Sequence, residues 1–113
     1  MIQVTVASKG AIRILGLTGQ LDAGSAPVAD KRLLGLIEDG DNRIVLDLAG
    51  LTYLASAGIR TVISSARMAR IGGGDVYIAG AVGFVSEVIE QCGLGELVRC
   101  FATPAEAAAA FPA

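Results

Sequence analysis

The sequence predicts a single α/β domain over residues 1–113, with a mixed, mostly parallel sheet of about five strands and about four helices. Short apolar runs alternate with segments of helical periodicity after an initial pair of strands, a pattern that favours parallel strands joined by crossover helices. At 113 residues, the chain is long enough for one domain with its own core. Its hydrophobic fraction of 53%, against 18% charged residues, indicates a globular protein.

The first part of the chain is expected to form a hairpin followed by a helix. Residues 2–7 alternate between apolar and polar, and residues 11–17 form a second strand that pairs antiparallel with the first. Residues 18–22 are expected to be a loop. A helix should then begin near Ser25 and end at the turn-rich cluster 38–42.

The centre of the chain is the segment from Ile44 to Ala69. Its continuous apolar run, residues 44–48, is typical of a strand buried on both faces. A turn follows, and from Gly58 to about Arg70 the apolar residues recur at helical spacing. The later elements are a strand, a helix, a short strand and a last helix that opens with a capping box, and they are expected at residues 75–80, 82–92, 98–101 and 103–110.

Composition excludes several functional classes. The net charge is −2, and the absence of Lys/Arg runs argues against a nucleic-acid partner. No stretch of about 18 apolar residues occurs, so no direct membrane insertion is expected. The absence of histidine excludes Ser-His-Asp and Cys-His catalytic arrangements. No metal or cofactor site is expected, and Cys92 and Cys100 are interpreted as small buried hydrophobic residues.

Ser56 stands just before the central helix, between residues too small to shield it. Two compatible interpretations follow. Ser56 is the N-cap of the helix, its hydroxyl accepting a bond from an early N–H group. Alternatively, Ser56 is exposed for phosphorylation, because the positive end of the helix dipole would accommodate a phosphate. Gly58, among these small residues, should let the backbone of a partner come close.

Residues 51–63, LTYLASAGIRTVI, resemble the central segment of the STAS domain, the fold of bacterial anti-sigma factor antagonists. Residues 56–60 match the family's pattern, whereas Ala55 stands where the family has Asp or Ser. Residues 19–22, Gly-Gln-Leu-Asp, resemble the Gly-x-Leu-Asp segment that leads into the family's first helix. The resemblance implies that Ser56 is the residue to which a partner kinase adds phosphate.

The first functional hypothesis is a regulatory binding module of the bacterial cytoplasm rather than an enzyme. The resemblance implies that the unmodified form binds an anti-sigma factor, itself a serine kinase, and so frees a sigma factor. Phosphorylation of Ser56 would break that contact. The contact is expected to involve the Ser56 loop and the exposed face of the following helix, with the partner-binding residues Ala55, Ser56, Ala57, Gly58, Arg60, Ser64 and Arg67.

Two alternatives stay open. The chain could be a STAS subunit or accessory of a membrane transporter, such as a phospholipid ABC transporter, with Ser56 only packing or capping, and Ala55 raises this alternative. Asp47 invites comparison with phosphoacceptor domains, but the acidic pair and the late Lys that such domains need are absent. Asp47 is therefore interpreted as a strand-end turn residue. The sequence leaves open whether two copies form a homodimer, and whether the fold binds a nucleotide or another small molecule.

Overall fold

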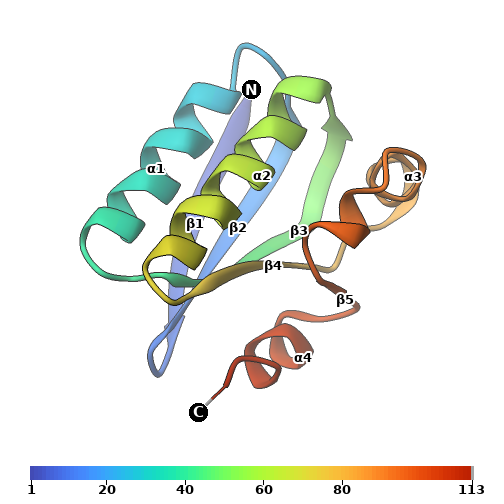
Figure 1. Ribbon diagram of the computed structural model, residues 1–113. Helices are drawn as coiled ribbons and strands as arrows, with labels where there is room; N and C mark the ends of the chain where they lie inside the picture. The colour runs from blue at the N-terminus through green and yellow to red at the C-terminus, as the bar shows by residue number, and fades with distance from the viewer. Residues whose placement is uncertain (113) are drawn as a thin grey trace.

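The computed structural model describes residues 1–112 as one sheet with helices on both faces (Figure 1). The elements in chain order are β1 (Ile2–Lys9), β2 (Ile12–Leu21), α1 (Ala26–Glu38), β3 (Arg43–Leu54), α2 (Ser56–Ile71), β4 (Asp75–Ala79), α3 (Gly83–Gln91), the 3₁₀ turn η1 (Leu94–Glu96), β5 (Cys100–Phe101) and α4 (Pro104–Ala109). The predicted fold class and element order are therefore confirmed.

The sheet has the strand order β1-β2-β3-β4-β5, so β3 lies at its centre. The β1–β2 pair is antiparallel, and every other neighbouring pair is parallel. The first two strands form a hairpin, and each later strand is reached through a helical crossover. β2, β3 and β4 therefore run in the same direction, so their carboxyl ends point to the same end of the sheet.

Two strands are longer than the sequence predicts. Residues 18–22 were expected to be a loop and residues 49–53 a turn, but β2 continues to Leu21 and β3 to Leu54. The reason is pairing, because β2 lies between two strands: Gly19 pairs with Ile2 on one side and with Leu51 on the other. Backbone groups that are bonded on both sides stay extended despite turn-forming residues.

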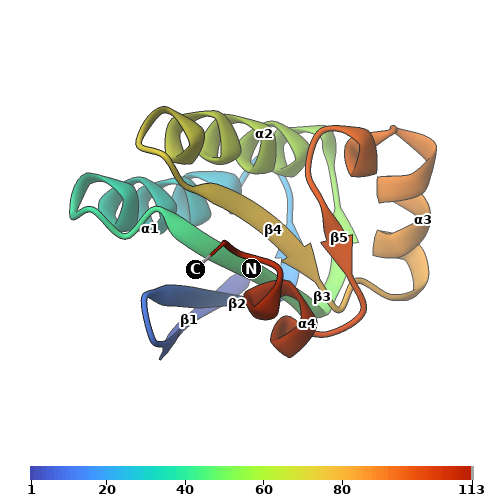
Figure 2. The same ribbon diagram turned by 60° about the horizontal axis from the view of Figure 1, so that its bottom comes forward.

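Helices cover the two faces of the sheet unequally (Figure 2). α1 and α2 lie side by side over one face, where the main core buries Leu15, Leu46 and Val62. α4 lies against the other face, where a smaller cluster packs Tyr77 on Phe111 with ring centroids 4.1 Å apart. α3 packs beside β3.

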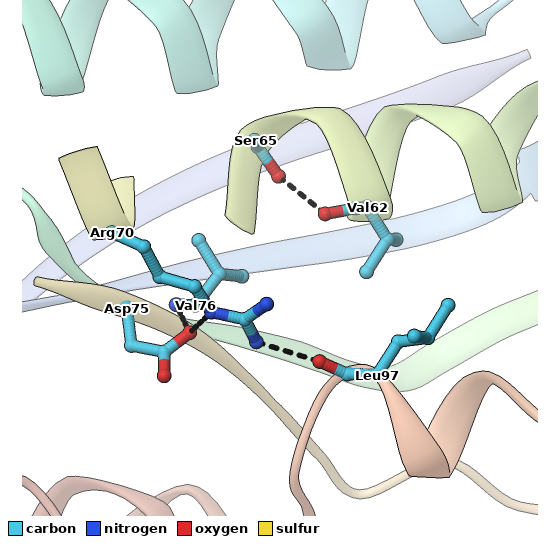
Figure 3. A network of polar contacts seen from close by, with 6 residues as sticks. All are labelled: Val62, Ser65, Arg70, Asp75, Val76 and Leu97. Atoms are coloured by element: carbon cyan, nitrogen blue, oxygen red, sulfur yellow. Dashed lines mark hydrogen bonds and ion pairs between the residues drawn. The ribbon is translucent and has the colours of Figure 1, made fainter. Parts of the chain in front are cut away.

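A polar network fixes the carboxyl-terminal end of α2 (Figure 3). The Nε of Arg70 donates to the Oδ1 of Asp75 over 2.9 Å, and its Nη2 donates to the carbonyl oxygen of Leu97 over 2.6 Å. Arg70 thereby joins α2 to the start of β4 and to the segment before β5. Fourteen residues at 1.5 Å each place this network about 21 Å from Ser56. The amino-terminal end of α2 is held differently, by packing on the core.

The cysteines do not follow the sequence prediction. Cys92 and Cys100 are both exposed and free, so their predicted burial is wrong. Cys92 caps the end of α3, and Cys100 begins β5, an edge strand of two residues that is shorter than the predicted strand 98–101. Neither cysteine side chain is covered by another layer of the fold. Among residues 1–112, no helix is both long and apolar enough to cross a membrane.

Candidate functional site

The candidate site lies where β3 ends and α2 begins, at the carboxyl edge of the sheet (Figure 1). Leu54 ends the strand as a buried residue, and Ala55 is the single residue between the two elements. Ser56 is the first residue of α2 and is exposed. The expected exposure of Ser56 is confirmed, and open α/β sheets place their binding sites at this edge.

Ser56 is not the cap of the helix. The N-cap is Ala55, whose backbone is extended at φ −101° and ψ 172°, and no side chain caps α2. The N–H of Ala55 donates to the carbonyl oxygen of Leu21 over 2.9 Å, which holds Ala55 as a continuation of the strand. Its own carbonyl accepts the N–H groups of Gly58 and Ile59 at 2.9 and 3.1 Å. The capping prediction for Ser56 is therefore wrong by one position, and its hydroxyl has no capping role.

The charged side chains of α2 itself are all positive. The helix contains Arg60, Arg67 and Arg70 but no Asp or Glu, and no acidic residue lies in its first turn. The helix dipole adds partial positive charge at Ser56 itself. Arg60 and Arg67 are exposed, whereas Arg70 is bonded in the network at the other end. An anion at Ser56 would meet favourable charge from both the backbone and a side chain one turn away.

Gly58 faces the core rather than a partner. It is buried, and a Cβ built at this position would lie 2.7 Å from the Cγ of Leu21 and 2.8 Å from the Cδ1 of Leu54. The expectation that Gly58 lets a partner's backbone come close is therefore wrong. The glycine instead lets the first turn of α2 approach β2 and β3.

The segment Gly19-Gln20-Leu21-Asp22 supports the site from the neighbouring strand. The side chain of Leu21 is buried against Gly58, and its carbonyl oxygen accepts the N–H of Ala55. The Oδ1 of Asp22 accepts the N–H groups of Gly24 and Ser25, both at 3.0 Å. The Ser25 N–H in particular lowers the pKa of Asp22 below its ordinary value. These hydrogen bonds hold the loop after β2, which lies beside the loop that carries Ser56.

A groove of about 1090 Å³ runs between α1 and α2. Ala57, Arg60, Ser64 and Arg67 all line it, so the structure brings these predicted partner-binding residues together on one surface. The opposite wall belongs to α1. The larger apolar residues of the groove, which were not predicted as part of the site, are Leu33, Leu34, Ile37, Ile63 and Met68.

Asp47 does not end a strand. It lies within β3, half-buried between Gly16 of β2 and Ala79 of β4, and its Oδ1 accepts the N–H of Ala49 over 3.1 Å. Its interpretation as a strand-end turn residue is therefore wrong, because β3 runs seven residues further, to Leu54. Within residues 1–112, no group of three or more Cys, Asp or Glu side chains could hold a metal ion.

Known proteins share both sequence and fold with this chain. A family model described as the STAS domain matches residues 3–107. BtrV of Bordetella bronchiseptica, named as an anti-sigma factor antagonist, is 32% identical over 95 residues, which cover 84% of this chain and 82% of BtrV. The anti-sigma-F factor antagonist RsfB of Mycobacterium tuberculosis is 28% identical over 103 residues, which cover 90% and 83%.

Solved structures share the fold at lower sequence identity. The crystal structure of an anti-sigma factor antagonist from Mycobacterium paratuberculosis matches with a TM-score of 0.88. The match has 20% identity and covers 97% of this chain and 93% of that one. At this identity the likeness shows the fold alone.

Proposed function

The chain belongs to the STAS domain family, and from that premise we propose that it is a cytoplasmic regulatory protein that binds an anti-sigma factor with serine kinase activity. The unmodified protein holds this partner and thereby frees a sigma factor. Phosphorylation of Ser56 releases the partner. The names of BtrV and RsfB as anti-sigma factor antagonists support the binding function.

The observation that carries the proposal is the exposed Ser56 at an uncapped helix start. Its hydroxyl makes no capping hydrogen bond to the helix, so a kinase need not break such a bond to reach it. The first turn contains no acidic side chain that would repel a phosphate. A domain can accept a charge at such a position without unfolding, because the dipole and Arg60 both favour the anion.

The switch follows from the cost of desolvating a charge. A phosphate adds about −1.5 to −2 charges at pH 7. If the partner encloses unmodified Ser56 in a close contact, the phosphate would have to lose its water there without a cation to replace it. Arg60 can neutralise only part of this charge and itself stays exposed. Phosphorylation therefore weakens the contact while leaving the fold intact.

A second candidate function is that of a STAS subunit of a membrane transporter. The observation that favours it is Ala55, which stands where the pattern of the anti-sigma factor antagonists has Asp or Ser. In that case Ser56 is only a surface residue at the start of α2, and a negative charge at this position would not change the binding of a kinase.

Binding measurements with charge variants distinguish the two functions. The probe is a purified anti-sigma factor serine kinase from the same organism, titrated calorimetrically with wild type, Ser56→Ala, Ser56→Asp and Ser8→Asp. Ser8 is an exposed residue near the hairpin at the opposite edge of the sheet, so it is the matched control. We expect Ser56→Asp to weaken binding at least tenfold, and the other two variants to bind like wild type. Equal binding by Ser56→Asp and Ser8→Asp would contradict the switch.

A further inference from the structure

The two exposed aromatic side chains of this protein lie together. The chain has two Tyr, three Phe and no Trp. Three of these rings belong to the cluster beneath α4, namely Tyr77, Phe101 and Phe111. The other two, Tyr53 and Phe84, are 44% and 50% exposed. Their rings stack on each other, with centroids 5.6 Å apart and planes inclined by 3°.

Both rings come from the edge of the sheet that carries Ser56. Tyr53 is the last residue but one of β3, and Ser56 follows three residues later. Phe84 lies in the first turn of α3, just after the loop that leaves the carboxyl end of β4. Val82 in that loop is 60% exposed and adds apolar surface. The stacking of the two rings places the start of α3 beside the end of β3, so both elements contribute to one side of the molecule.

We propose that Tyr53 and Phe84 form an aromatic anchor for the kinase that acts on Ser56, an inference that rests on the proposed function. A kinase that modifies Ser56 must enclose it. A standard interface buries about 800 Å² per partner, equal to a circle of about 16 Å radius. Three residues of chain span at most about 11 Å. An interface centred on Ser56 therefore extends over Tyr53 and the ring stacked on it.

The pair has the properties of a binding hot spot. Tyrosine is enriched among the residues that dominate interface energies, and large rings bury much apolar area for few rotatable bonds. Stacking holds Tyr53 and Phe84 in one arrangement before the partner arrives, which lowers the entropy lost on binding. The partner should therefore offer an apolar pocket for the rings.

The anchor and Ser56 have separate roles in the contact. The rings supply apolar area whether or not Ser56 carries a phosphate, whereas Ser56 supplies the charge that reverses binding. Removal of the anchor should therefore raise the KM for phosphorylation of this protein more than it changes kcat, because the rings do not touch the reacting hydroxyl.

The test compares Tyr53→Ala and Phe84→Ala with Ile71→Ala. Ile71 is an 87% exposed apolar residue at the other end of α2, so it controls for the loss of surface hydrophobicity. Calorimetric titration with the same anti-sigma factor kinase should show a loss of affinity of about tenfold or more for both aromatic variants and none for Ile71→Ala. Phe84→Leu keeps part of the apolar area and should lose less. Thermal melts of all variants should stay within a few degrees of wild type.

Three outcomes would overturn the inference. If wild type binds the kinase and both alanine variants bind within twofold of it, the anchor is wrong while the proposed function stands. If wild type itself does not bind, the proposed function fails and the anchor fails with it. If sedimentation shows that the variants change self-association of this chain and leave kinase binding unchanged, the rings belong to a contact between two copies.

Discussion

Gly58→Ala is the substitution whose cost can be derived most directly from the packing. The added Cβ would lie 2.7 Å from the Cγ of Leu21 and 2.8 Å from the Cδ1 of Leu54, whereas ordinary carbon contacts are about 3.5–4.0 Å. Both leucines are buried, so neither can turn away freely. Overpacking of this kind costs about 1–3 kcal/mol, and the better helix propensity of Ala returns up to about 1 kcal/mol. Once this gain is subtracted, we expect a net loss of up to about 2 kcal/mol.

Gly35→Ala is the matched control for this experiment. Gly35 also lies within a helix, but a Cβ there meets nothing within 4 Å. Gly35→Ala should therefore stabilise the protein by about 0.5–1 kcal/mol. The assay is urea denaturation of both variants, followed by kinase titration at a temperature where both are folded. Folded Gly58→Ala should bind like wild type, because its Cβ points into the core. Equal stability changes for the two variants, or weak binding by folded Gly58→Ala, would refute the packing account.

Two further variants test local structure. Thr103→Ala should destabilise the protein by about 1 kcal/mol, because the Oγ1 of Thr103 accepts the Glu106 N–H at the start of α4 over 3.2 Å; Thr103→Ser, which keeps the hydroxyl, should restore most of this in urea melts. Asp22→Asn tests the loop after β2. The bond from the Ser25 N–H lowers the folded-state pKa of Asp22, so its carboxylate contributes stability above the ordinary pKa of 3.8 and loses it as the pH falls through the lower folded-state pKa. The stability difference between wild type and Asp22→Asn should shrink between about pH 5 and pH 2, and a pH-independent difference would contradict this role of Asp22.

The sequence predicted an element well where the end of that element is set by residues only a few positions apart in the chain. The capping box at Thr103 predicted the start of α4 correctly, because the cap is a contact between residues three apart. Gly93 follows α3 in the left-handed conformation, with φ 72°, as a glycine just past the end of a helix commonly does. The exposure of Arg60, Ser64 and Arg67 on α2 also follows from helical periodicity.

The errors arose where distant residues decide the structure. The extension of β2 depends on pairing with β1 and β3, and the extension of β3 depends on pairing with β2, which no single segment reveals. Gly58 looked like an open approach for a partner because the contact with Leu21 lies 37 residues away in the sequence. Tyr53 and Phe84 gave no joint signal for the same reason: their stacking requires α3 to lie beside β3.

Phosphorylation at Ser56 is the central claim, and intact-protein and peptide mass spectrometry test it most directly. The protein is incubated with ATP and an anti-sigma factor serine kinase from the same organism. Ser56→Ala is the control, and a known anti-sigma factor antagonist is incubated with its own kinase in parallel. The account predicts one added phosphate on wild type, located on Ser56, and none on Ser56→Ala. Phosphate on another residue, or none on wild type while the parallel antagonist is modified, would contradict the account and favour the transporter-linked function.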